Sequence, residues 1–128
     1  ATYTGIAYGW YAETEDARNL RPYWGMARVV VDFASRSATV TIEDTRTYDS
    51  ENMPVPAAFS ASTGAVAGVA ENYLTGTVAA NSMNGGISLR YYGPAQDAGA
   101  PAEIGGTFTL SHPVSGEAVL GGFLGRRQ

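Results

Sequence analysis

Side chains that commonly do acid–base or nucleophilic chemistry are scarce in this sequence. It contains one histidine, His112, and neither lysine nor cysteine. Catalytic triads, Schiff-base lysines and cysteine nucleophiles all need residues from that set. His112 follows Ser111, but the stretch SHPVSG at 111–116 is typical of a polar turn between two strands, which favours a solvated histidine over a catalytic base. The sequence therefore predicts a protein that is not an enzyme.

Carboxylates gather in two polar stretches, ETED at 13–16 and DSEN at 49–52. Hard cations such as Ca²⁺ take oxygen ligands from loops of this kind. Neither stretch has the glycine turn and the ligand spacing of a calcium-binding loop, so a solvated surface is favoured over a metal site. No metal ion and no other cofactor is expected.

The stretch RPYW joins Arg21, Tyr23 and Trp24, whose residue types are enriched at binding hot spots. In the competing interpretation Tyr23 and Trp24 lead into a strand and plug a barrel end, while Arg21 extends toward solvent. Tyr91 and Tyr92 raise a similar question, because adjacent strand residues point to opposite faces, and the outward one either binds a partner or merely covers the sheet. We predict a binding site made of Arg21, Tyr23, Trp24 and Tyr92.

The composition predicts one all-β domain over residues 1–128. With 128 residues and 45% hydrophobic content, the chain is long enough to bury its own core. Its 16 glycines and 8 tyrosines, together with many Thr, Ser and Val, favour strands over helices. The net charge of −4 argues against a nucleic-acid partner, because such proteins concentrate Lys and Arg on one face.

Alternating apolar and polar residues, separated by turn signals, predict about eight to nine strands and no long helix. Loops are expected at 12–24, 45–56 and 93–102, with Pro22 stopping any helical turn in the first of them and NGG at 84–86 acting as a turn. The expected strands cover 3–11, 25–33, 37–44, 57–63, 65–70, 73–79, 87–92, 103–111 and 118–125.

Two of these strands carry adjacent glycines, Gly105–Gly106 and Gly121–Gly122. Such a pair is unfavourable inside a strand unless the chain bends there or a neighbouring aromatic ring needs the space. Strongly coiled sheets close into barrels, so we expect a single antiparallel up-and-down β-barrel of about eight strands, with a sandwich as the alternative. Its interior should hold Val29, Val31, Phe33, Val40, Ile42, Ile87, Leu89, Phe108 and Leu110.

The last third of the chain resembles a known family. YYGP at 91–94, AEIGGTFTL at 102–110 and GGFLGRR at 121–127 are similar, in this order, to the closing strands of the barrel domains of transferrin-binding protein B and related bacterial surface lipoproteins. The opening ATYTGIA and the VVVDF strand also suit that barrel. The resemblance implies a protein that binds a host iron protein, haem or a complement regulator through loops at one barrel end. The sequence departs from the family in lacking its handle domain, lipidated cysteine and long basic loops.

Two functions remain open at this point. In the first, the chain is a non-enzymatic binding protein, secreted or on the outer-membrane surface of a bacterium, whose barrel-end loops hold a host or environmental protein or a small ligand. In the second, it is a structural subunit of a surface filament or coat that self-associates by strand addition through Ala1–Ala12. Export fits both, because the sequence begins at Ala1 without Met and contains no apolar run of transmembrane length.

Overall fold

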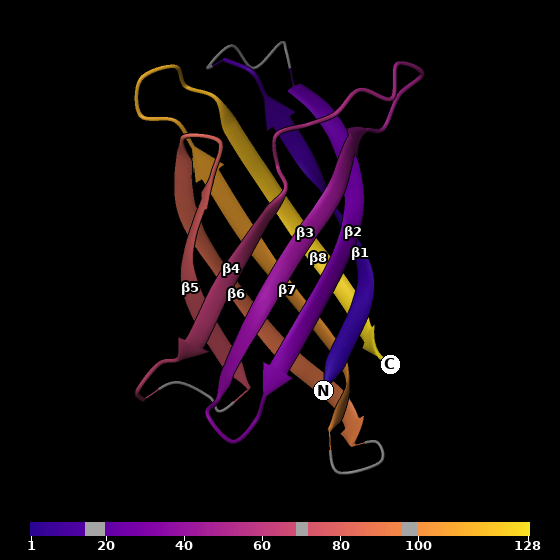
Figure 1. Ribbon diagram of the computed structural model, residues 1–128, viewed down its shortest axis with the longest axis vertical. Coiled ribbons are helices and arrows are strands. Elements are labelled where there is room, and N and C mark those ends of the chain that lie inside the picture. Colours follow the sequence, from indigo (N-terminus) through magenta and orange to yellow (C-terminus); the bar gives the residue numbers. More distant parts are fainter. Residues whose placement is uncertain (15–19, 69–71, 96–99) are drawn as a thin grey trace.

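The chain folds into a closed antiparallel barrel of eight strands (Figure 1). The computed structural model describes residues 1–14, 20–68, 72–95 and 100–128. Each strand pairs with its neighbours in the sequence, and β1 pairs with β8 to close the cylinder, so the expected all-β, up-and-down architecture is confirmed. The strands are β1 (Thr2–Ala12), β2 (Leu20–Asp32), β3 (Ser37–Thr47), β4 (Phe59–Ala65), β5 (Tyr73–Ala80), β6 (Met83–Ala95), β7 (Pro101–Ser111) and β8 (Ala118–Arg127).

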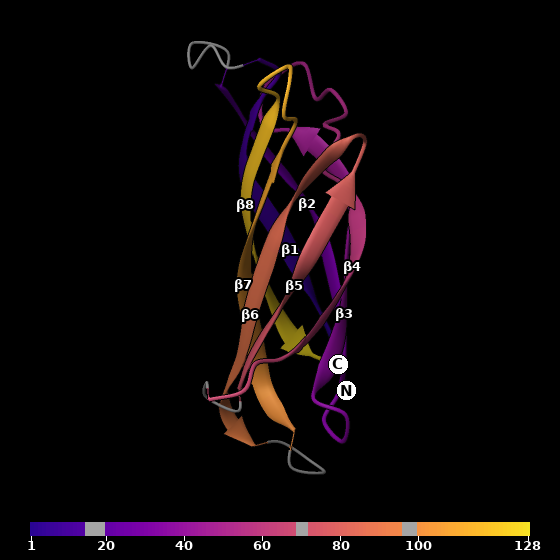
Figure 2. The same cartoon turned by 90° about the vertical axis from the view of Figure 1, so that its left-hand side faces the viewer.

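The up-and-down order gives the barrel two different ends. The connections β1–β2, β3–β4, β5–β6 and β7–β8 meet at one end, which we call the loop end. Figure 2 shows the remaining connections at the opposite end together with both chain termini, and we call this the terminal end. The described parts of the loops expected at 12–24 and 45–56 lie at the loop end, whereas those of 93–102 lie at the terminal end; residues 15–19 and 96–99 are outside the described residues.

The interior of the barrel is filled by apolar side chains from all eight strands. Alternate residues of a strand point inward, so the apolar half of each alternating pattern forms the core. Phe33 is a partial exception, because it lies just beyond β2 at the terminal end and is half-buried, with its ring edge-on to Tyr91 at 5.1 Å between centroids. The other residues expected inside are buried: Val29, Val31, Val40, Ile42, Ile87, Leu89, Phe108 and Leu110.

The start of β2 was predicted wrongly. The strand begins at Leu20 rather than at Gly25, and Pro22 lies within it instead of ending a loop. The carbonyl of Pro22 accepts a hydrogen bond from the Tyr48 N–H at 2.7 Å, so the side of Pro22 without an N–H faces β3. The β2–β3 ladder already ends at the pair Tyr23–Thr47. A proline is tolerated there because no ladder hydrogen bond is lost.

Two further boundaries differ from the sequence prediction. The strand expected at 65–70 is not formed in its described part, because Ala65 ends β4 and a turn follows; residues 69–70 lie outside the described residues. The NGG sequence at 84–86 lies inside β6, and the tight turn precedes it at Asn81 and Ser82, which have φ values of 51° and 71°. Asn commonly adopts this left-handed conformation, which a short hairpin needs.

One glycine of each pair gives space to an aromatic ring inside the barrel. Gly106 lies directly opposite Phe123 across the β7–β8 ladder, and a Cβ added at Gly106 would lie 2.5 Å from Cζ of that ring. Gly121 lies opposite Phe108 in the same way, again with 2.5 Å to Cζ. The β7–β8 register runs through both pairs without a bulge. Close packing of an aromatic ring, together with the Ser88 carbonyl at Gly106 and the Tyr23 hydroxyl at Gly121, therefore explains these two glycines.

The other glycine of each pair faces outward and also lies beneath an aromatic side chain. A Cβ added at Gly105 would lie 3.2 Å from the Tyr92 hydroxyl, and one added at Gly122 would lie 3.4 Å from the Tyr8 hydroxyl. Tyr8 and Gly122 are direct partners in the β1–β8 ladder. A glycine pair thus lets aromatic side chains lie close to the sheet on both of its faces.

The N-terminal strand has hydrogen-bonding partners along both of its edges. Strand β1 pairs with β2 from Thr2 to Ala12 and with β8 from Tyr3 to Ala12. Donation of this strand to a neighbouring subunit would break both ladders and open the barrel. Strand β1 therefore has no free edge for the strand addition considered above, whereas the described β4–β5 ladder is only two residue pairs long.

Candidate binding surface

Large apolar side chains project outward from β8, β1 and β2, and seven of them lie in three consecutive rows across these strands, with Leu20 and Val30 of β2 beyond the rows. Each of the seven is between 43% and 58% exposed. The strand pairing makes them neighbours, in rows that read Leu120–Trp10–Pro22, Gly122–Tyr8–Trp24 and Leu124–Ile6–Met26 from the loop end toward the middle of the barrel. We call this surface the apolar face; its seven residues are Ile6, Tyr8, Trp10, Trp24, Met26, Leu120 and Leu124.

Small inward residues allow β1 to carry this outward row. Gly5 and Gly9 alternate with Ile6 and Tyr8, and a Cβ at either glycine would collide with a carbonyl oxygen of β8. The backbones of β1 and β8 therefore approach closely on the inside of the barrel. The large side chains of Ile6, Tyr8 and Trp10 therefore lie on the outside of the barrel, where they contribute little to the core.

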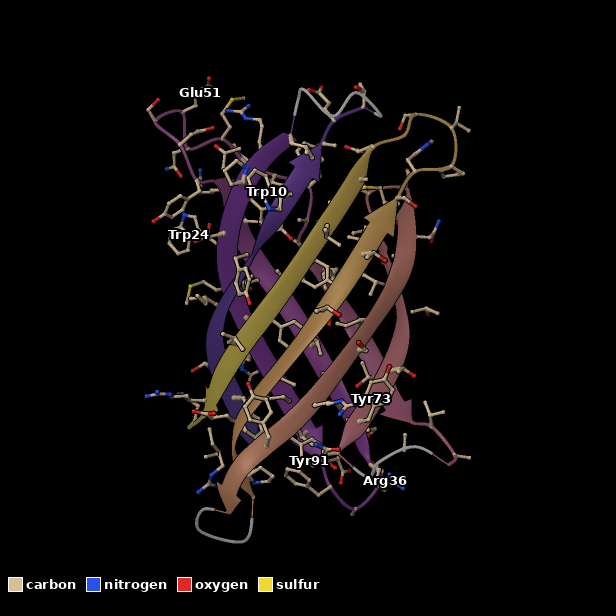
Figure 3. All side chains as sticks on the ribbon, turned by 180° about the vertical axis from the view of Figure 1, so that it is seen from behind. Trp10, Trp24, Arg36, Glu51, Tyr73 and Tyr91 are labelled. Carbon is tan, nitrogen blue, oxygen red and sulfur yellow. The ribbon has the colours of Figure 1, made fainter. Side chains whose placement is uncertain are left out.

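Trp10 stands between two apolar grooves. A groove of about 430 Å³ separates it from Leu120 and is also lined by Leu20. A second groove, of about 380 Å³, lies between Trp10 and the side chains of Trp24 and Tyr48. Figure 3 shows Trp10 and Trp24 beside each other near the loop end, with Glu51 beyond them.

The structure separates the residues that were expected to form one binding anchor. Arg21, Tyr23 and Trp24 lie in strand β2 rather than in a loop. Tyr23 points into the barrel and is 2% exposed, whereas Trp24 points outward and is 43% exposed on the apolar face. The competing interpretation thus holds for Tyr23, which lies inside the barrel, and not for Trp24, which a partner can reach.

Arg21 is held by the β3–β4 connection. Its guanidinium contacts a carboxylate oxygen of Asp49 and one of Glu51, each at 2.9 Å. Asp49 also accepts hydrogen bonds from the Thr47 hydroxyl at 2.9 Å and from the Asn52 N–H at 3.2 Å. The Arg21 hydrogen bond, followed by that of Thr47, lowers the pKa of Asp49 to about 2. This network fixes the loop that presents Tyr48 beside Trp24.

Tyr92, the fourth predicted binding residue, lies apart from the other three. It projects outward from β6 and is 42% exposed, while Tyr91 packs against the core. Together with Ile6, Leu124 and Arg126 it lines a surface groove of about 380 Å³. Tyr92 thus borders the apolar face on the side nearer the terminal end.

The remaining candidate groups for catalysis or metal binding are His112 and the acidic side chains. The Nδ1 atom of His112 accepts hydrogen bonds from the Val114 and Ser115 N–H groups, each at 3.1 Å, and so orders the β7–β8 turn. Among the residues that the structure describes, no group of three or more His, Asp or Glu side chains is placed to hold a metal ion. Nor do the described segments contain a helix long and apolar enough to cross a membrane.

Comparison with known proteins supports the fold. No protein-family model matches the chain, and no curated protein matches its sequence. A similar solved structure is the vaccine antigen Transferrin Binding Protein B of Haemophilus parasuis, with a TM-score of 0.60 and 18% identity over 98% of this chain. The chain spans 26% of the length of that protein. The likeness confirms the barrel that the closing sequence motifs indicated.

Most residues of the apolar face were not predicted as binding residues from the sequence. In the sequence, Ile6, Tyr8 and Trp10 alternate with Ala7 and Gly9, so large and small residues fall on opposite sides of the strand. This contrast in size was the available signal. It was misleading by itself, because large apolar residues on a strand usually face the core. In β1 they mark the solvent side.

Proposed function

We propose that this chain is a non-catalytic binding domain displayed outside a bacterial cell, and that its apolar face contacts a partner protein. The observation that carries the proposal is the size of that face. At about 100 Å² for each half-exposed side chain, its seven residues offer roughly 700 Å². The largest apolar patch of a typical monomer measures about 300–600 Å². One side of a standard protein–protein interface measures roughly 800 Å².

The residue types support a protein partner. Two tryptophans, a tyrosine and a methionine belong to the types enriched at interface cores, and the charged residues lie at the margins of the face. The side chains project from hydrogen-bonded strands rather than from loops. A partner would therefore meet a preordered surface and lose little entropy in fixing it.

The fold neighbour supplies a first probe. Its name describes a transferrin-binding protein, so a barrel of this type occurs in a bacterial protein that binds another protein. Fold likeness does not transfer the partner. The partner class we propose is a host or environmental protein, and the location is the bacterial surface or the medium.

The proposal is tested by surface plasmon resonance with transferrin first and then with fractionated host serum proteins. The test variant is Ile6→Glu, in the middle of the apolar face, and the matched control is Ser62→Glu, on the outward side of β4. We expect any specific partner to bind at least about tenfold more weakly to Ile6→Glu than to the control. Equal binding by both variants would exclude the apolar face as the contact surface.

The proposed location is tested separately. Protease treatment of intact cells that produce the protein should digest it, whereas a periplasmic reference protein should survive. Complete protection until the outer membrane is permeabilised would contradict surface display.

A further inference from the structure

We propose that the apolar face also holds a second copy of this chain, with two barrels packed face to face and pointing in opposite directions. This inference rests on the proposed function, because it names an occupant of the same surface. It follows from the charges at the margins of the face, from its shape and from its area.

The margin at the loop end is acidic. Glu13, Asp49 and Glu51 lie there. Two described cations are close to them: Arg21 is shared between Asp49 and Glu51, and Arg46 pairs with Asp44 at 3.5 Å and donates to the Asn52 carbonyl at 3.2 Å. Glu51 remains well exposed in this arrangement, with 61% of its side chain open. Figure 3 places it just beyond Trp10 and Trp24. Among the described residues, carboxylates therefore outnumber guanidinium groups at this end of the face.

The margin toward the terminal end is basic. Arg28 and Arg126 flank Thr4 in the row that follows Ile6 along β1. Both arginines are exposed, and the nearest described carboxylate to Arg126, that of Glu103, is 3.9 Å away. A distance of that size in solvent contributes little, so Arg126 keeps most of its charge available to a partner.

These margins favour one orientation of two copies. A two-fold axis that lies in the interface and runs across the barrel axis brings the acidic margin of each copy against the basic margin of the other. The parallel arrangement instead sets acid against acid and base against base, which is unfavourable. Charge complementarity therefore selects the antiparallel pair.

Shape and composition agree with a second apolar face as the occupant. Trp10 forms a ridge between grooves of about 430 and 380 Å³, so a face that meets its own copy can place a ridge in a groove. Four of the seven residues are aliphatic or thioether side chains: Ile6, Met26, Leu120 and Leu124. Such side chains make no directional hydrogen bonds, which disfavours a polysaccharide. The roughly 700 Å² available on each copy approaches that of a standard interface.

The first measurement is sedimentation equilibrium of the chain over a wide range of concentration. We expect a reversible dimer of twice the 13.4 kDa chain mass. Ile6→Glu should lower the association constant at least about tenfold, whereas Ser62→Glu, which adds the same charge on the opposite side, should leave it unchanged. A chain that stays monomeric at every concentration would overturn the inference. So would a dimer that survives Ile6→Glu.

The orientation is tested by charge reversal at the two margins. One variant, Arg28→Glu with Arg126→Glu, makes both margins acidic; the other, Glu13→Arg with Glu51→Arg, makes both basic. In the antiparallel arrangement each variant alone repels its own copy, and an equimolar mixture restores the dimer. Restoration in the mixture also shows that both variants are folded. Variants that self-associate as well as the unaltered chain would overturn the antiparallel orientation.

The outcomes separate this inference from the proposed function. A monomeric chain that binds transferrin or a serum protein, and loses that binding on Ile6→Glu, would overturn self-association and support the proposed function. A dimer that dissociates on Ile6→Glu but binds no foreign protein would support self-association and count against a host or environmental partner.

Discussion

The outside of the barrel is divided into two surfaces of different chemistry. Strands β8, β1 and β2 present the apolar face, whereas β3, β4, β6 and β7 present rows of hydroxyl groups, which we call the hydroxyl face. Hydroxyl pairs across its ladders, such as Thr41 with Ser60 at 3.4 Å and Ser88 with Thr107 at 3.5 Å, lie at the limit of hydrogen bonding. The hydroxyl face consists of Thr39, Thr41, Ser60, Ser62, Ser88, Thr107 and Thr109.

Both faces cover the same core, so the core does not require them to differ. Inward side chains from β2 and from β4 both belong to one hydrophobic core, and the strands form a closed barrel. Small β-branched residues are sufficient on the outside of a strand, as the hydroxyl face demonstrates. Exposing large apolar side chains to water on one side of the barrel is unfavourable and does not stabilise the fold. We therefore attribute these side chains to binding.

The strongest test of this division compares two adjacent residues of β2. Tyr23→Ala removes an inward ring that is 2% exposed and should lower the free energy of unfolding by about 4 kcal/mol. Trp24→Ala removes an outward ring and should lower it by about 1 kcal/mol or less. Urea unfolding, at a concentration where the chain is monomeric, measures both. A large loss for Trp24→Ala would make the apolar face part of the folded core.

The second prediction concerns the glycines beneath the aromatic rings. In Gly106→Ala the added methyl group would lie 2.5 Å from the Phe123 ring and collide with the Ser88 carbonyl, so we expect a loss of about 3 kcal/mol. Gly64 in β4 is the matched control, because a Cβ there meets nothing within 4 Å. Gly64→Ala should therefore be neutral or slightly stabilising in the same unfolding experiment. Equal losses in the two variants would show that the close contacts at Gly106 do not set the effect of an added methyl group.

The sequence predicted the barrel and most of its core because both depend on local alternation. The alternation of a few neighbouring residues is enough to predict that side chains such as Val29 and Phe108 point inward. The motifs near the end of the sequence indicated which type of barrel to expect. Strand ends depended on longer-range contacts. Pro22 is accommodated because Tyr48, 26 positions away, donates to its carbonyl beyond the end of the ladder.

The binding surface was harder to predict because it is assembled by closure of the barrel. Trp10 and Leu120 become neighbours only when β1 pairs with β8, and no local pattern gives that register. The expected anchor grouped Tyr23 with Trp24 because they are adjacent in sequence. In a strand that adjacency sends the two side chains to opposite faces.

A third prediction tests the apolar face by converting part of it to the chemistry of the hydroxyl face. Leu120→Thr with Leu124→Thr should change the free energy of unfolding by about 1 kcal/mol or less, because both side chains are about half exposed and Thr retains strand propensity. Binding of the dye ANS to the folded protein should fall markedly. Unchanged dye binding would show that these side chains are not part of an accessible apolar surface.

The smallest predicted effect is local and depends on pH, at the loop that borders the apolar face. Arg21 and Thr47 hold the pKa of Asp49 near 2, below its ordinary value of 3.8, so the charged carboxylate stabilises the loop above about pH 4. This contribution is lost as the pH falls from about 4 to about 2. The protection of the backbone amides of Glu51 and Asn52 against hydrogen exchange, relative to their intrinsic rates at each pH, should fall over that interval, because both amides donate to Asp49.

A local measurement is needed because the pKa of Asp32 is also lowered, by backbone hydrogen bonds from Ser35 and Ala34 in the turn at the terminal end. A global unfolding curve would mix the two carboxylates. The control is Asp49→Asn, whose loop amides should be less protected already at neutral pH and show no further loss of protection attributable to this carboxyl between pH 4 and 2. Loosening this loop should also release Tyr48 from beside Trp24, so the groove between them would widen. Amides that stay equally protected in Asp49→Asn at neutral pH would show that Asp49 does not order the edge of the apolar face.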